Sequence, residues 1–120
     1  MRVLVVEDND PVRQTIADVL QIMDHDVLTA PSGEDALDQL KRTNTVPDLL
    51  ISDVSLPGID GIALLHFIQR QYPRCRAIIT SGLPRDEHDI QDVQFLQKPF
   101  TLDQLLKHVD VSVPYQSVAV

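Results

Sequence analysis

Three acidic residues and one lysine follow short apolar segments, in a pattern that could support chemistry on a charged ligand. Glu7 and Asp8 end the run LVVED, Asp53 ends DLLISD, and Lys98 follows the last apolar segment in FLQKPF. Each segment has the length and composition typical of a buried strand. In a parallel α/β sheet the carboxyl ends of neighbouring strands meet at one edge, where ligands bind. Three carboxylates and one ammonium at that edge would suit a divalent cation and a phosphoryl group.

The elements that would position these residues alternate regularly along the chain. Apolar segments at residues 3–6, 26–30, 48–52, 76–80 and 93–97 indicate five strands. Helical spacing of apolar residues indicates helices over residues 11–23 and 60–71, and helices that begin near residues 32 and 101. This alternation predicts an α/β fold of the (βα)5 type, a doubly wound five-stranded parallel sheet with helices on both faces.

Two of the expected helices begin with capping signatures. Ser32 is followed three residues later by Asp35, and Thr101 is followed by Gln104 at the same spacing. A hydroxyl at the first position and a polar side chain at the fourth can satisfy free backbone N–H groups at a helix start. In the last helix an apolar stripe is expected to face the core, formed by Leu102, Leu105, Leu106 and Val109.

Composition predicts a small, acidic domain with an aliphatic core. The 120 residues are 43% apolar with no tryptophan, which suits one domain over residues 1–109 and a tail or linker over 110–120. The net charge of −8 comes without a basic stripe, which argues against direct nucleic-acid binding. Cys75 is the single cysteine, so no internal disulfide can form. No secretory signal or membrane-spanning segment is apparent, and we expect a cytoplasmic location.

A combination of motifs identifies a family resemblance. The chain has an acidic pair after the first strand, an Asp after the third, a P-G-x-D-G loop at 57–61, a hydroxyl residue after the fourth strand and a K-P pair after the fifth. From Arg2 to about Val109 it resembles the receiver domain of two-component response regulators. The resemblance implies a flavodoxin-like strand order of 2-1-3-4-5 and a signalling switch controlled by phosphorylation, rather than a turnover enzyme.

The same resemblance implies a role for each residue of the acidic site. Asp53 would accept a phosphoryl group from a sensor histidine kinase or a histidine phosphotransfer protein. Glu7, Asp8 and Asp53 would hold Mg²⁺ together with the backbone carbonyl of Ser55, since magnesium prefers oxygen ligands. Lys98 would contact Asp53 or a phosphoryl oxygen, and its bond to the following proline resembles the family's cis peptide.

The hydroxyl that would contact the phosphoryl group has two candidates, Thr80 and Ser81. In the family the hydroxyl residue is followed by a small residue. Ser81 is followed by Gly82 and fits this pattern better, so Thr80 is the second choice. Strand alternation would point the two side chains to opposite faces of the sheet. Phe95 lies three residues before Lys98 and matches the family's aromatic switch position.

One departure from the family concerns the segment between the fourth and fifth strands. Lys98 follows Ser81 by only 17 residues, whereas typical receivers carry several more. The missing length falls in the fourth helix, which we expect to be shortened to one or two turns over residues 86–92. In many family members this helix forms part of the output or dimer surface. The shortening therefore predicts that signalling to an output domain or target protein uses another face or a disordered segment.

Two other functions fit parts of the pattern. A receiver-like interaction module could keep the fold without being phosphorylated, and the short fourth helix gives this alternative some support. Phosphatases of the haloacid dehalogenase type also place a nucleophilic Asp after a strand, but they resemble D-x-D, and here the second position is Ser55. The complete set of acids, hydroxyl and lysine favours the phosphorylated switch.

Overall fold

A computed structural model describes residues 1–82 and 92–112 of the chain. All five expected strands are present, and their bounds differ from the sequence expectation by at most one residue at each end. The strands are β1 (Arg2–Val6), β2 (Asp26–Ala30), β3 (Leu49–Asp53), β4 (Arg76–Ser81) and β5 (Val93–Gln97). The helices are α1 (Asp10–Ile22), α2 (Gly33–Thr43), α3 (Gly61–Gln71) and α4 (Leu102–Ser112).

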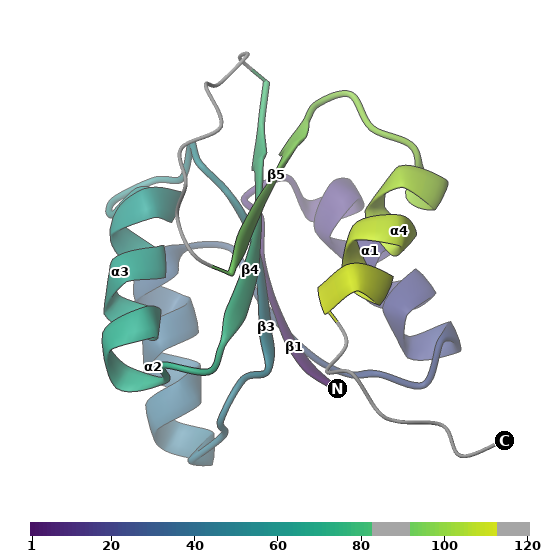
Figure 1. Cartoon of the computed structure of the whole chain (residues 1–120). Helices are drawn as coiled ribbons and strands as arrows, with labels where there is room; N and C mark the ends of the chain where they lie inside the picture. Colours follow the sequence, from purple (N-terminus) through teal and green to yellow (C-terminus); the bar gives the residue numbers. More distant parts are fainter. Residues whose placement is uncertain (83–91, 113–120) are drawn as a thin grey trace, which may run out of the picture.

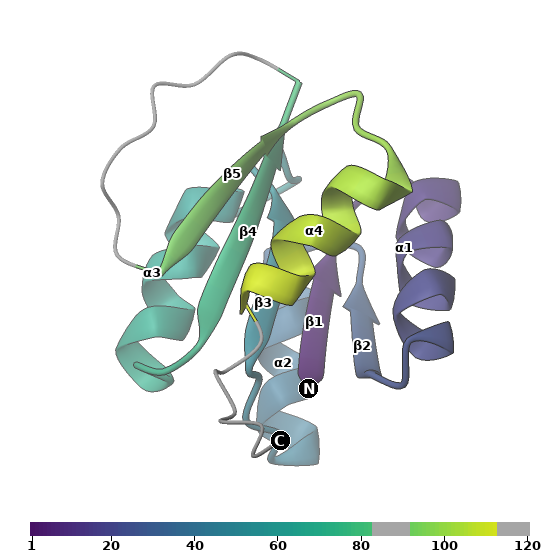
Figure 2. The same cartoon turned by 45° about the vertical axis from the view of Figure 1, so that its right-hand side comes forward.

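The five strands form one parallel sheet in the order β2-β1-β3-β4-β5, which confirms the predicted topology. Its order reverses at β1, since the chain moves outward to β2 and then crosses back to β3. The carboxyl ends of β1 and β3 are therefore neighbours, and the space beside this switch point is where ligands bind in open α/β sheets. Figure 2 shows the sheet with α4 crossing in front of it.

Helices cover both faces of the sheet, with α2 and α3 on one side and α1 and α4 on the other (Figure 1). Each strand sends alternate residues into the two layers: Leu4 and Leu50 pack in the layer of α2 and α3, and Val5 and Ile51 pack in the layer of α1. Fully burying an aliphatic side chain of this size contributes about 1.5–3 kcal/mol. The two layers therefore fix the sheet from both faces and hold its carboxyl edge in place.

Polar caps set the helix starts. Asn9, Ser32 and Asp60 each accept a hydrogen bond from the backbone N–H three residues on, at the starts of α1, α2 and α3. At α4 the expected reciprocal pair is present: the Gln104 N–H donates to Thr101 Oγ1 at 3.1 Å, and the Thr101 N–H donates to Gln104 Oε1 at 2.8 Å.

One detail of the sequence prediction was wrong. Leu102 was expected to face the core with the rest of its stripe, but it is 42% exposed, whereas Leu105 and Val109 are buried. Leu102 is the first residue of α4, and it lies at the rim of a surface groove next to Pro99 and Phe100 rather than beneath the helix.

Two expectations fall where the structure makes no statement. The short fourth helix expected at residues 86–92 lies almost wholly outside the described residues, as does most of the tail. Within the described ranges, no helix is long and apolar enough to cross a membrane.

Candidate metal and phosphoryl site

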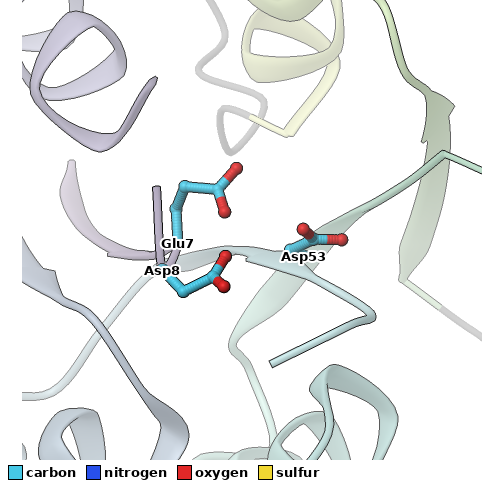
Figure 3. Close-up of side chains that lie close together, drawn as sticks. All are labelled: Glu7, Asp8 and Asp53. Atoms are coloured by element: carbon cyan, nitrogen blue, oxygen red, sulfur yellow. The ribbon is translucent and has the colours of Figure 1, made fainter. Parts of the chain in front are cut away.

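The three predicted acids come together at the carboxyl edge of the sheet. Glu7 and Asp8 follow β1 directly, and Asp53 is the last residue of the adjacent strand β3. One carboxylate oxygen from each residue lies within 4.8 Å of the other two. Figure 3 shows the three side chains together, with Asp53 approaching from its own strand. Carboxylate oxygens at this spacing are the ligand type that Mg²⁺ and Ca²⁺ prefer.

Lys98 joins this cluster from the end of β5. Its Nζ donates to Glu7 Oε1 at 2.6 Å and to Asp53 Oδ2 at 3.0 Å. The Glu7 and Asp53 side chains are 4% and 12% exposed, and that of Lys98 is 27% exposed. The peptide bond between Lys98 and Pro99 is cis, as the resemblance implied. One ammonium thus bridges two nearly buried carboxylates that come from different strands.

The electrostatics of the cluster follow from this burial. Burial raises the pKa of Glu7, and neighbouring Asp8 and Asp53 add to the rise while the bond from Lys98 opposes it. Burial by itself would lower the pKa of Lys98, but its hydrogen bonds to Glu7 and Asp53 outweigh that effect and raise it. Three carboxylates against one ammonium leave two formal negative charges, which a divalent cation would offset.

Arg13, a residue that the sequence analysis did not single out, fixes the acidic loop from α1. Its guanidinium donates to the backbone carbonyl of Glu7 at 2.8 Å and forms an ion pair with Asp10. The Asp10–Arg13 spacing was visible in the sequence, since residues three apart are neighbours on a helix. The bond to Glu7 was not, because it depends on how the loop folds back over the first turn.

Gly61 allows the chain to pass close to Asp53. A Cβ at this position would lie 2.1 Å from the Asp53 carbonyl oxygen, and the Gly61 N–H donates to the carbonyl of Val54 at 2.8 Å. Glycine is used where backbone must approach backbone this closely. The P-G-x-D-G motif had indicated the loop but not this contact, which seats the start of α3 against the end of β3.

The backbone just after Asp53 is oriented by the carboxylate itself. The N–H of Ser55 donates to Asp53 Oδ1 at 3.3 Å, and Ser55 is exposed at the start of the loop. The resemblance implied that the backbone carbonyl of Ser55 is a ligand of the metal ion. Ser55 follows Asp53 by two residues in the sequence.

The predicted switch residues lie on β4 and β5 beside the cluster. Thr80 pairs with Asp53 in the sheet and is only 3% exposed, whereas Ser81 ends β4 and is partly buried. Phe95 is partly buried in the layer of α2 and α3, and it pairs with Ile79. Because side chains alternate along a strand, Ser81 and Phe95 share one face of the sheet, and Thr80 belongs to the other.

Comparison with known proteins identifies the family of the domain. Residues 3–110 match the family model of the response regulator receiver domain. The chain is 36% identical over 108 residues to the sensor kinase CckA of Brucella abortus, covering 86% of this chain and 11% of that protein. It is 30% identical over 116 residues to the DNA-binding transcriptional regulator NtrC of Klebsiella pneumoniae, covering 92% of this chain and 24% of that protein.

Solved structures give the same result. The receiver domain of the hybrid histidine kinase CckA superposes with a TM-score of 0.82 at 35% identity, covering 95% of this chain and all of that one. The chemotaxis protein CheY4 of Vibrio cholerae superposes with a TM-score of 0.83 at 26% identity, covering 93% of this chain and 98% of that one. The chain spans less than a third of the two curated relatives above. It belongs to the response regulator receiver domain family, whose members are signalling switches.

Proposed function

We propose that this receiver domain is switched by phosphorylation of Asp53 in a Mg²⁺-dependent reaction. The observation that carries the proposal is the cluster of Glu7, Asp8 and Asp53 with Lys98 at the carboxyl edge of the sheet. A carboxylate oxygen of Asp53 attacks the phosphorus of a phosphohistidine donor. The P–N bond breaks, the histidine keeps the electron pair, and an acyl phosphate forms on Asp53.

Glu7, Asp8 and Asp53 are the side chains that would hold Mg²⁺, with the backbone carbonyl of Ser55 as a further ligand. When bound, the ion offsets negative charge on the carboxylates and on the incoming phosphoryl group. Lys98 contributes a cation of the protein itself, since its ammonium already lies 3.0 Å from Asp53 Oδ2. After transfer it pairs with a phosphoryl oxygen in place of the carboxylate oxygen.

The switch itself uses residues of β4 and β5. The Ser81 hydroxyl, with Thr80 as second choice, donates to a phosphoryl oxygen. The movement of this hydroxyl towards the phosphoryl group frees space that the Phe95 ring then occupies. The common face of Ser81 and Phe95 supports this pairing. A new charged group thereby biases a two-state surface at the ends of these strands.

The partners follow from this chemistry. The donor would be a sensor histidine kinase or a histidine phosphotransfer protein, and the recipient an output domain or a separate target protein. The relatives include a sensor kinase and a DNA-binding transcriptional regulator, so sequences similar to this domain occur in both kinds of protein. We place the domain in the reducing cytoplasm, where the free, buried thiol of Cys75 would remain stable.

Intact mass spectrometry tests the proposal. The wild type, Asp53→Asn and the distant surface variant Asp38→Asn are incubated with phosphoramidate, with Mg²⁺ or with EDTA. Wild type and Asp38→Asn should gain one phosphoryl group only with Mg²⁺, and Asp53→Asn should gain none. A wild type that neither gains mass nor binds Mg²⁺ would instead be an unphosphorylated interaction module. Sustained turnover of an aryl phosphate would indicate a phosphatase.

A further inference from the structure

The loop over residues 55–60, which joins β3 to α3, carries a proposed metal ligand and has to be held near Asp53. Its base is closed by two hydrogen bonds: the Val54 N–H donates to the carbonyl of Thr80 at 2.9 Å, and the Gly61 N–H donates to the carbonyl of Val54. These bonds fix where the loop leaves β3 and where it enters α3. They leave open what fixes the middle of the loop.

Glu34, in the first turn of α2, contacts this middle part. Its Oε1 accepts a hydrogen bond from the Ile59 N–H at 3.0 Å, across 25 residues of sequence. Gly58 lies against the same carboxylate, since a Cβ there would come within 2.0 Å of Glu34 Oε2. Gly58 also has a φ of 74°, a conformation that glycine adopts readily. The carboxylate therefore lies directly against the loop backbone.

A second contact joins the same two segments. A Cβ on Gly33 would lie 2.6 Å from Cγ1 of Ile59, so the absence of a side chain at position 33 lets Ile59 pack on the start of α2. Ile59 is itself partly buried against the core layer of α2 and α3. The start of α2 and the loop thus pack directly against each other.

An acid in the first turn of a helix has an ordinary role, because negative charge there interacts favourably with the helix dipole. Asp35 supplies the same charge at the next position, and its N–H is the donor to the Ser32 cap. The dipole accounts for having acids at both positions. It does not account for the hydrogen bond that Glu34 accepts from the Ile59 N–H, 25 residues further along the chain.

We propose that Glu34 is a positioning residue for the phosphoacceptor site: by holding the Ile59 N–H it keeps the 55–60 loop, and with it the Ser55 carbonyl, in the arrangement that binds Mg²⁺. The inference rests on the proposed function. Glu34 itself touches neither metal nor phosphoryl group, and it acts through the loop backbone.

Three variants test this role. Glu34→Ala removes the acceptor, Glu34→Gln keeps an acceptor oxygen without the charge, and Asp35→Ala removes an equivalent charge from the same helix turn. The Kd for Mg²⁺ is measured by calorimetric titration, the phosphorylation rate with phosphoramidate by intact mass, and the Tm by circular dichroism. Losing this solvent-exposed hydrogen bond should weaken Mg²⁺ binding by about fivefold in Glu34→Ala. Glu34→Gln should recover most of that loss, and Asp35→Ala should leave the Kd unchanged.

A purely structural role for Glu34 would lower the Tm of Glu34→Ala while leaving the Kd and the phosphorylation rate at wild-type values, and that result would overturn the inference. An equal loss of Mg²⁺ affinity in Asp35→Ala would also overturn it, because charge at the helix start would then be the cause. A wild type that binds no Mg²⁺ would refute the proposed function first, so the two failures are distinguishable.

Discussion

Replacing Asp8 with asparagine should make the metal-free protein more stable and should abolish its stabilisation by Mg²⁺. One carboxylate oxygen each from Glu7, Asp8 and Asp53 lies within 4.8 Å of the other two. Lys98 binds Glu7 and Asp53, whereas Asp8 is exposed beside them. The negative charge of Asp8 is therefore repelled by Glu7 and Asp53, and the Lys98 ammonium is already paired with those two residues. This repulsion destabilises the metal-free protein.

The magnitude follows from the distances. Two unit charges at this separation repel by about 3 kcal/mol at an effective dielectric of about 20. Exposure of Asp8 to water and the nearby Lys98 reduce the net effect to about 1 kcal/mol, which corresponds to a rise in Tm of about 4 °C. For the wild type, Mg²⁺ at about ten times its Kd should add about 1.4 kcal/mol to the free energy of unfolding.

Urea denaturation followed by circular dichroism, with Mg²⁺ or with EDTA, measures both effects. The control is Asp38→Asn, which removes an exposed acid paired with Arg42 on α2. This variant should keep the full response to Mg²⁺ and should not gain stability in EDTA. The reasoning is refuted if Asp8→Asn is less stable than the wild type in EDTA, or if it is stabilised by Mg²⁺ as strongly as the wild type.

Three further predictions follow from individual contacts. Gly61→Ala should lower the free energy of unfolding by about 1–3 kcal/mol, because the added Cβ meets the Asp53 carbonyl. Gly82→Ala should change this free energy little, because a Cβ there meets nothing within 4 Å. Equal losses for the two variants in urea denaturation would contradict this prediction. Burial raises the pKa of the Cys75 thiol to about 12, so at pH 8 iodoacetamide should alkylate it roughly a thousandfold more slowly in the native protein than in urea, and similar rates would show that the thiol is accessible. Lys98→Met should lower the free energy of unfolding by about 2–4 kcal/mol at pH 7, because it leaves the carboxylates of Glu7 and Asp53 without their cation. Adding Glu7→Gln to this variant should restore part of the lost stability. An unchanged urea midpoint in Lys98→Met would contradict the role of the ion pair.

Much of the fold could be predicted because its signals are local. The strands are short apolar segments, and the caps at Ser32 and Thr101 depend on residues three positions away. Strand order came from the family resemblance rather than from periodicity. The position of Leu102 was missed because a regular apolar stripe does not show that the first residue of the helix lines a surface groove instead of the core.

The site was predictable in its members but not in its contacts. Lys98 and Glu7 are 91 residues apart, so the parallel topology could bring them to one edge without giving their hydrogen bond. Arg13, Gly61 and Glu34 act through backbone atoms of other segments, and such contacts leave no pattern in a single sequence. The family resemblance identified the residues proposed to carry out the chemistry. The structure added Arg13, Gly61 and Glu34, which contact the backbone around those residues.

Chemical mapping of the phosphorylated residue is the most direct test of the central claim. After incubation with phosphoramidate and Mg²⁺, borohydride reduces an aspartyl phosphate to homoserine, which peptide mass spectrometry locates in the sequence. Homoserine should appear at position 53, and it should be absent when EDTA replaces Mg²⁺. Phosphate found on Ser81 or Thr80, or homoserine at another aspartate with position 53 unmodified, would contradict the assignment of Asp53 as the phosphoryl acceptor.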